Sequence, residues 1–136
     1  MLFRSKHASQ SSQVQAVVSF AGPTDLTAEE LWSKETLTRN LVPLLGGPPR
    51  EKPELYSKAS PVRYHPRTPP PFLLVHGSAD TVVPPTQARA LADRLREAGG
   101  QVQVVVLEGA GHTWAGQDLL RSIDRMLTFL DETLKK

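Results

Sequence analysis

Two titratable residues follow two apolar segments in the second half of the sequence. Asp80 lies just after one of them, at the end of the run His76–Asp80. His112 lies after the other and is flanked by glycine. A carboxylate beside an imidazole fixes the tautomer of the ring and stabilises the imidazolium that forms when the ring takes a proton. Asp80 and His112 are therefore the candidates for general acid–base catalysis.

Each of these residues also has a structural interpretation. Asp80 is a typical turn residue, and His112 fits a loop histidine that bonds to the backbone. We interpret His76 as a structural histidine that satisfies nearby backbone groups. His76, Asp80 and His112 together offer two nitrogens and one oxygen to zinc, but their spacing matches no zinc motif, so no metal is expected. Gly109–Gly111 begins like a dinucleotide fingerprint whose third glycine is replaced by Trp114, so no cofactor is expected.

Three short apolar segments are typical of buried parallel strands. They are rich in β-branched residues and nearly continuous in hydrophobicity, which indicates strands covered on both faces. The segments are Val14–Phe20, Phe72–His76 and Val102–Leu107. Because ligands meet the loops at the carboxyl ends of parallel strands, we expect Asp80 and His112 to emerge side by side at that edge.

The segments between the strands carry helix signals. Thr27 and Glu30 form a capping box, and the helix that follows is expected to be broken by Pro43. A second helix is expected over Thr86–Ala98, stopped by two glycines. The last helix is expected over residues 117–134. Its predicted buried stripe consists of Leu119, Leu120, Ile123, Met126, Leu127 and Leu130.

The order of these elements predicts an α/β fold, in which a three-stranded parallel sheet has flanking helices. One domain is expected over residues 14–136. Residues 1–13 are polar and rich in serine, and they are expected to form a loop or tail. Of the 136 residues, 39% are hydrophobic, which is enough for one packed unit.

Composition and charge exclude several kinds of partner. The 16 basic and 14 acidic residues leave a net charge of +2, and the basic residues do not cluster, so no nucleic acid is expected. No apolar run approaches the roughly 18 residues of a membrane span. The sequence has no cysteine, which excludes disulfides and a thiol nucleophile. These features assign no cellular compartment.

Four runs of sequence resemble the end of an α/β-hydrolase domain. The run LLVHGSADTVVPPTQA, followed later by EGAGHTW, carries most of the resemblance. The runs VQAVVSFAGPTDL and LLGGPPREKPELYSKASPVRY are similar to bacterial carboxylesterases of the feruloyl and acetyl-xylan esterase type, close to the prolyl oligopeptidase catalytic domain. The resemblance covers residues 13–136. It implies that Asp80 is the triad acid, that His112 is the triad base, and that the parent enzyme acts on a small ester or peptide.

The sequence departs from this family pattern at the nucleophile. It contains no GxSxG motif, which is the elbow that carries the serine nucleophile in this fold. The N-terminal serines neither follow a strand nor lie between glycines, and we interpret them as a polar linker: Ser5, Ser9, Ser11 and Ser12. The chain is therefore expected to be the C-terminal part of a serine hydrolase that carries the acid and base but no nucleophile, and to be inactive alone.

The alternative interpretation is a non-catalytic α/β module that binds a partner through an exposed sheet edge. A 13-residue, mostly polar segment with little strand character precedes the strand Val14–Phe20, and no proline or lysine guards this strand. Unguarded edges recruit further strands, so a second copy or a complementary N-terminal fragment is the expected partner. A response-regulator-like domain fits less well, because it needs five strands and clustered acids after the first one.

Overall fold

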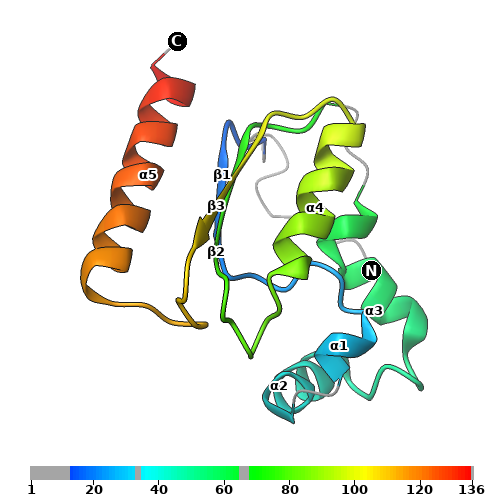
Figure 1. Cartoon of the computed structure of the whole chain (residues 1–136). Coiled ribbons are helices and arrows are strands. Elements are labelled where there is room, and N and C mark those ends of the chain that lie inside the picture. The colour runs from blue at the N-terminus through cyan, green and yellow to red at the C-terminus, as the bar shows by residue number, and fades with distance from the viewer. Residues whose placement is uncertain (1–12, 33–34, 65–67, 136) are drawn as a thin grey trace, which may run out of the picture.

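The computed structural model describes residues 13–32, 35–64 and 68–135. Its three strands form one parallel sheet in the order β1-β2-β3 (Figure 1). The strands are β1 (Val17–Phe20), β2 (Phe72–Gly77) and β3 (Val102–Leu107). The predicted α/β fold with a three-stranded parallel sheet is therefore confirmed.

Strand β1 is shorter than predicted, because it begins at Val17 rather than at Val14. The backbone N–H of Val17 donates to the carbonyl oxygen of Pro71 at 3.0 Å. The chain before β2 consists of the prolines Pro69–Pro71, which have no N–H to donate to a neighbouring strand. Residues 14–16 therefore have no ladder to join, and Val14 is exposed.

Strand β2 is central, and its side chains alternate between two apolar layers. Helix α4 (Thr86–Glu97) covers one face of the sheet and helix α5 (Gly116–Leu134) covers the other (Figure 1). Leu74 packs with Leu91 of α4, whereas Leu73 packs with Phe129 of α5. Helix α4 begins at the predicted residue and ends one residue earlier than predicted, because Ala98 is its C-cap.

Between β1 and β2, the residues that the structure describes form four short helical segments. They are α1 (Glu29–Trp32), α2 (Glu35–Leu45), α3 (Pro53–Ala59) and the 3₁₀ helix η1 (Pro61–Arg63). Leu31 and Tyr56 from these segments form a separate apolar cluster with Val83. Because Val83 belongs to the loop that carries Asp80, this cluster fixes one end of that loop.

Two predictions for this helical region are wrong. The first helix begins at Glu29 and is not capped by Thr27, because Asp25 Oδ1 accepts hydrogen bonds from the N–H of Thr27 at 3.0 Å and from its hydroxyl at 2.5 Å. The side chain of Thr27 is thus used in the preceding turn. Pro43 does not break its helix, because α2 continues through it to Leu45. A proline this close to the end of a helix removes only one backbone hydrogen bond.

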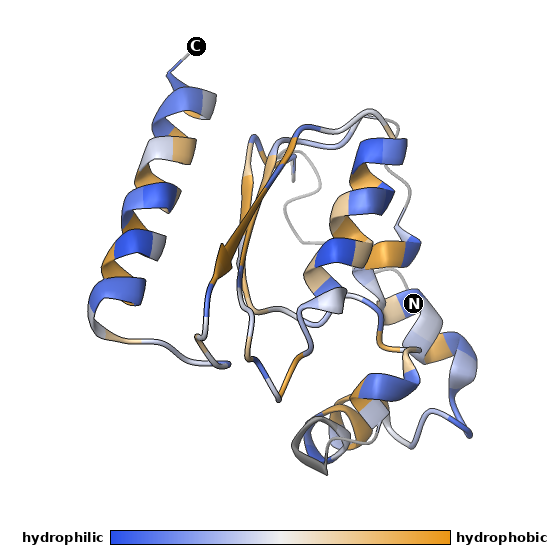
Figure 2. Cartoon of the chain, viewed as in Figure 1, coloured by the Kyte–Doolittle hydropathy of each residue, from blue (hydrophilic) through white to orange (hydrophobic). Residues whose placement is uncertain are grey.

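The predicted buried stripe of the last helix is only partly buried. Ser122 and Phe129 are the buried residues of α5, and Met126 and Leu130 pack partly against the sheet. The exposed members of the stripe are Leu119, Leu120, Ile123 and Leu127. Figure 2 shows apolar residues along α5, and the narrow sheet covers only one side of them. Across the described residues, no helix has the length and apolar character needed to cross a membrane.

The loops after β2 and β3 meet at Gly77, the last residue of β2. The N–H of Ala79 donates to the carbonyl oxygen of Ala110 at 2.9 Å. A Cβ atom added at Gly77 would lie 2.3 Å from that oxygen and 2.4 Å from the carbonyl oxygen of Gly111. Only a residue without a side chain therefore lets the two loops approach this closely.

We expect Gly77→Ala to lower the free energy of unfolding by about 1–3 kcal/mol, because the backbone must move to admit the methyl group. Gly111→Ala is the matched control, since a Cβ atom there would have no atom within 4 Å. Chemical denaturation followed by circular dichroism measures both variants. Equal stability of the two would show that the loops are not in close contact.

Candidate active site

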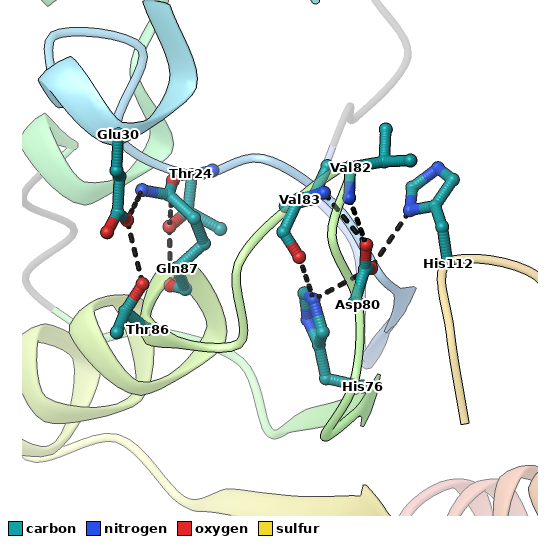
Figure 3. Close-up of polar contacts among 9 residues, drawn as sticks. All are labelled: Thr24, Glu30, His76, Asp80, Val82, Val83, Thr86, Gln87 and His112. Atoms are coloured by element: carbon teal, nitrogen blue, oxygen red, sulfur yellow. Dashed lines mark hydrogen bonds and ion pairs between the residues drawn. The ribbon is translucent and has the colours of Figure 1, made fainter. Parts of the chain in front are cut away.

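Asp80 and His112 lie side by side at the carboxyl edge of the sheet (Figure 3). Strands β2 and β3 pair in parallel up to Gly77 and Leu107, so the loops that follow them begin at the same height. Nδ1 of His112 lies 2.9 Å from Oδ2 of Asp80. The contact predicted from the two strand ends is therefore present.

The carboxylate of Asp80 is fully buried, with 0% of its side chain exposed. Its Oδ1 accepts hydrogen bonds from the backbone N–H groups of Val82 at 2.8 Å and Val83 at 2.9 Å. Asp80 thus shapes its own turn, as its residue type predicted. The turn occupies Oδ1 and leaves Oδ2 to face His112 (Figure 3).

Opposing effects set the pKa of Asp80. Burial raises this pKa, because the charged form is poorly solvated inside the protein. Hydrogen bonds from His112 and from the N–H groups of Val83 and Val82 favour the charged form, and the pKa of Asp80 is lowered overall. The side chain is therefore an ionised acceptor at neutral pH.

The ring of His112 presents one nitrogen to Asp80 and the other away from it (Figure 3). An ionised carboxylate only accepts hydrogen bonds, so Nδ1 carries a hydrogen, and in the neutral form of the ring the lone pair is on Nε2. The His112 side chain is 37% exposed, unlike its partner. An imidazole held in this way can take a proton at Nε2 from a group that arrives from solvent.

His76 is buried and bonds to the backbone, as predicted from its place in the sequence. Its Nε2 lies 2.8 Å from the carbonyl oxygen of Val83. The same nitrogen lies 3.2 Å from Oδ2 of Asp80, a contact that the sequence analysis missed. The two residues meet only because the loop turns back on the strand, and the sequence gives no direct signal of that. In the part of the chain that the structure describes, no group of three or more His, Cys, Asp or Glu residues is placed to hold a metal ion.

Other residues near the pair make structural contacts. Trp114 packs edge-to-face on Phe20 with ring centroids 6.0 Å apart, and its Nε1–H donates to Ser122 at 3.1 Å. Ser78 links the two loops, since its hydroxyl donates to Glu108 at 3.0 Å. The N-terminal serines considered above, Ser5, Ser9, Ser11 and Ser12, lie outside the described residues.

Gln87 is a buried residue whose role the sequence analysis missed. Its Oε1 accepts hydrogen bonds from the N–H groups of Thr24 at 2.9 Å and Asp25 at 2.8 Å. Its Nε2 donates to Glu30 at 2.8 Å. These bonds tie the loop after β1 to the start of α4 (Figure 3). Polar residues of this type are usually exposed, so the sequence offers no signal for this role.

Solved structures of hydrolases are similar to this chain along most of its length. A truncated form of a carbohydrate esterase from gut microbiota matches with a TM-score of 0.79 and 28% identity, over 94% of this chain and 45% of that one. A puromycin-hydrolyzing peptidase of Mycobacterium tuberculosis matches with a TM-score of 0.77 and 30% identity, over 88% of this chain and 18% of that one. The described strands and helices correspond to the C-terminal part of an α/β-hydrolase fold.

Curated relatives are similar in sequence. Esterase LipC of Mycobacterium tuberculosis is 48% identical over 69 residues, which are 50% of this chain and 16% of LipC. The chain spans between 16% and 25% of the length of the curated relatives that it matches.

The BD-FAE family model matches residues 2–95. This match includes strands β1 and β2, the Asp80 turn and most of α4. From this match, together with the fold and the hydrolase relatives, we conclude that the chain belongs to the BD-FAE family of α/β-hydrolases.

Proposed function

We propose that Asp80 and His112 are the acid and the base of a catalytic triad that hydrolyses carboxylic esters. The observation that carries this proposal is the 2.9 Å contact between a buried carboxylate and a partly exposed imidazole. The esterase relatives support ester substrates. Peptide bonds are the second substrate class, which the similarity to a puromycin-hydrolyzing peptidase supports.

The proposed reaction is acyl transfer through a serine nucleophile. Nε2 of His112 takes the proton of the serine hydroxyl while the serine oxygen attacks the ester carbonyl carbon, and Asp80 stabilises the imidazolium without taking the proton. His112 then gives this proton to the leaving alcohol as the C–O bond breaks, which leaves an acyl-serine. His112 next takes a proton from the water that attacks the acyl carbon. It returns this proton to the serine oxygen as the bond between that oxygen and the acyl carbon breaks, and the carboxylic acid is released.

The serine nucleophile is proposed to come from outside these 136 residues. The sequence has no GxSxG motif. Ser78, in the same loop as Asp80, bonds instead to Glu108 at 3.0 Å and to the N–H of Gly109 at 2.8 Å. On this proposal, the chain alone would lack a nucleophile and oxyanion donors, which are the groups that supply most of the rate enhancement.

Strand β1 is the proposed docking edge for the segment that carries the nucleophile. Among the described strands, β1 pairs on one side only, with β2. Phe20 at its end is 43% exposed. A complementary N-terminal segment would add a strand and the nucleophile at this edge by β-augmentation. A second copy of the chain, which has no GxSxG motif, would add a strand only. The exposed apolar residues of α5 would add to the surface that such a partner covers.

A non-catalytic interaction module is the second candidate function, and the unpaired edge of β1 favours it. In such a module, the contact between Asp80 and His112 would only hold two loops together. The two candidates differ in whether a complemented chain gains hydrolysis that depends on His112.

We expect the purified chain to hydrolyse p-nitrophenyl acetate no faster than its His112→Ala variant. Addition of a GxSxG-containing N-terminal segment from a BD-FAE esterase should produce turnover. Asp80→Asn should then reduce the rate by about 10⁴-fold, because it removes the group that orients and stabilises the imidazole. A spectrophotometric assay of nitrophenol release measures these rates.

Asp93→Asn is the control for this assay, because Asp93 is an exposed carboxylate that pairs with Arg96 on α4. Restored turnover that survives His112→Ala would contradict the proposed base. Turnover by the isolated chain that is lost on replacement of Ser5, Ser9, Ser11 or Ser12 would contradict an external nucleophile.

The lowered pKa of Asp80 predicts how stability depends on pH. The pKa of an aspartate in the unfolded chain is about 3.9. A carboxyl whose pKa is lower than this in the folded protein stabilises the fold at pH values above about 3.9. This contribution is lost as the pH falls below about 3.9 and passes through the folded-state pKa. We therefore expect Asp80→Asn to be less stable than the original chain at pH 6, by about 1–3 kcal/mol, and the difference to shrink at pH 3. Urea denaturation at both pH values measures this, and an equal difference at both would contradict the pKa shift.

A further inference from the structure

A second histidine contacts the carboxylate oxygen that faces His112. Nε2 of His76 lies 3.2 Å from Oδ2 of Asp80 and 2.8 Å from the carbonyl oxygen of Val83. The side chain of His76 is only 2% exposed, and the residue lies near the end of the central strand β2. The triad proposed above uses Asp80 and His112 and gives His76 no part.

The chemistry of the contacts fixes the direction of these hydrogen bonds. A carbonyl oxygen only accepts, so Nε2 of His76 carries a hydrogen that it donates to Val83. Oδ2 of Asp80 lies 3.2 Å from the same nitrogen, which is an electrostatic contact. Val83 in turn donates its own N–H to Oδ1 of Asp80 at 2.9 Å. Two hydrogen bonds, His76 to Val83 and Val83 to Asp80, and the 3.2 Å contact between Nε2 of His76 and Oδ2 of Asp80 therefore link the three residues (Figure 3).

The contact with His76 adds a second restraint on the side chain of Asp80. Rotation about the Cβ–Cγ bond of an aspartate is intrinsically broad and moves both oxygens. The N–H groups of Val82 and Val83 restrain it at Oδ1, and His76 restrains it at Oδ2. Such a rotation would move Oδ2 out of line with His112. His76 stands on a strand that is paired on both sides, and a rigid strand holds a side chain more precisely than a loop does.

We propose that His76 is a positioning residue that holds Oδ2 of Asp80 toward His112 and thereby fixes the tautomer of the His112 ring. This inference rests on the proposed function for its catalytic meaning, but its test does not need a nucleophile. A purely structural His76 would satisfy the Val83 carbonyl and leave the state of His112 unchanged.

The test reads the tautomer of His112 in the ¹⁵N-labelled chain at neutral pH, by long-range ¹H–¹⁵N correlation. The original chain should show His112 with its hydrogen on Nδ1 and His76 with its hydrogen on Nε2. His76→Phe should shift His112 from mostly Nδ1–H to mostly Nε2–H and abolish the slowly exchanging Nδ1 proton. His76→Gln, whose amide keeps an N–H at a similar reach, should retain the Nδ1–H form.

Thr24→Val is the matched control for lost stability. It removes the buried hydrogen bond from the Thr24 hydroxyl to the backbone carbonyl of Gln87, 2.6 Å long, and should leave His112 unchanged. If His76→Phe does not fold, His76→Asn takes its place, because its amide is too short to reach Oδ2. A folded His76→Phe or His76→Asn variant that keeps the Nδ1–H form of His112 would overturn the proposal. So would a His76 ring with its hydrogen on Nδ1 in the original chain.

The outcomes of this experiment and of the complementation assay are separable. An assay without turnover, with the tautomer results as expected, would overturn the catalytic proposal and leave His76 as a residue that positions Asp80. Turnover that depends on His112, together with a His112 tautomer that replacement of His76 does not change, would support the catalytic proposal and overturn the positioning role of His76.

Discussion

A carboxylate that is ionised and sealed from water needs a hydrogen-bond donor for each oxygen, because an unpaired buried charge is very costly. The surroundings of Asp80 meet this need from three parts of the chain. Its own turn supplies two N–H groups to Oδ1. The loop after β3 supplies His112 as the donor to Oδ2, and strand β2 brings Nε2 of His76 within 3.2 Å of the same oxygen.

These donors converge only because distant segments hold the Asp80 loop in place. Val83, whose N–H and carbonyl both take part, packs with Leu31 and Tyr56 from the helical region between β1 and β2. Gly77 lets the loop after β3 approach within hydrogen-bond distance. The helical region between β1 and β2 thus holds the Asp80 loop by apolar packing, whereas the loop after β3 holds it by direct hydrogen bonds.

The features that the sequence predicts well are those with local causes. Strand β3 has the predicted bounds and β2 differs by one residue, because both carry short, nearly continuous apolar runs. The meeting of Asp80 and His112 follows from parallel pairing, which the order of elements already implies.

The features that the sequence misses depend on partners far along the chain. Strand β1 is three residues shorter than predicted because prolines precede its neighbour. Thr27 is withdrawn from its expected cap by Asp25. The contact of His76 with Asp80, and the burial of Gln87 between two loops, arise from loop conformations that no periodic pattern encodes.

The central position of β2 has a consequence for how the molecule opens. Among the described strands, only β2 is paired on both sides, while β1 and β3 are edges. Edge strands fray by local fluctuations, whereas a central strand exchanges its amide hydrogens with solvent only when the whole sheet comes apart. Fraying of β3 would carry His112 away and leave Asp80 and its turn beside His76 at the end of the most protected strand. The contact between Asp80 and His112 is therefore lost in a transiently opened molecule, while the contact between Asp80 and His76 persists.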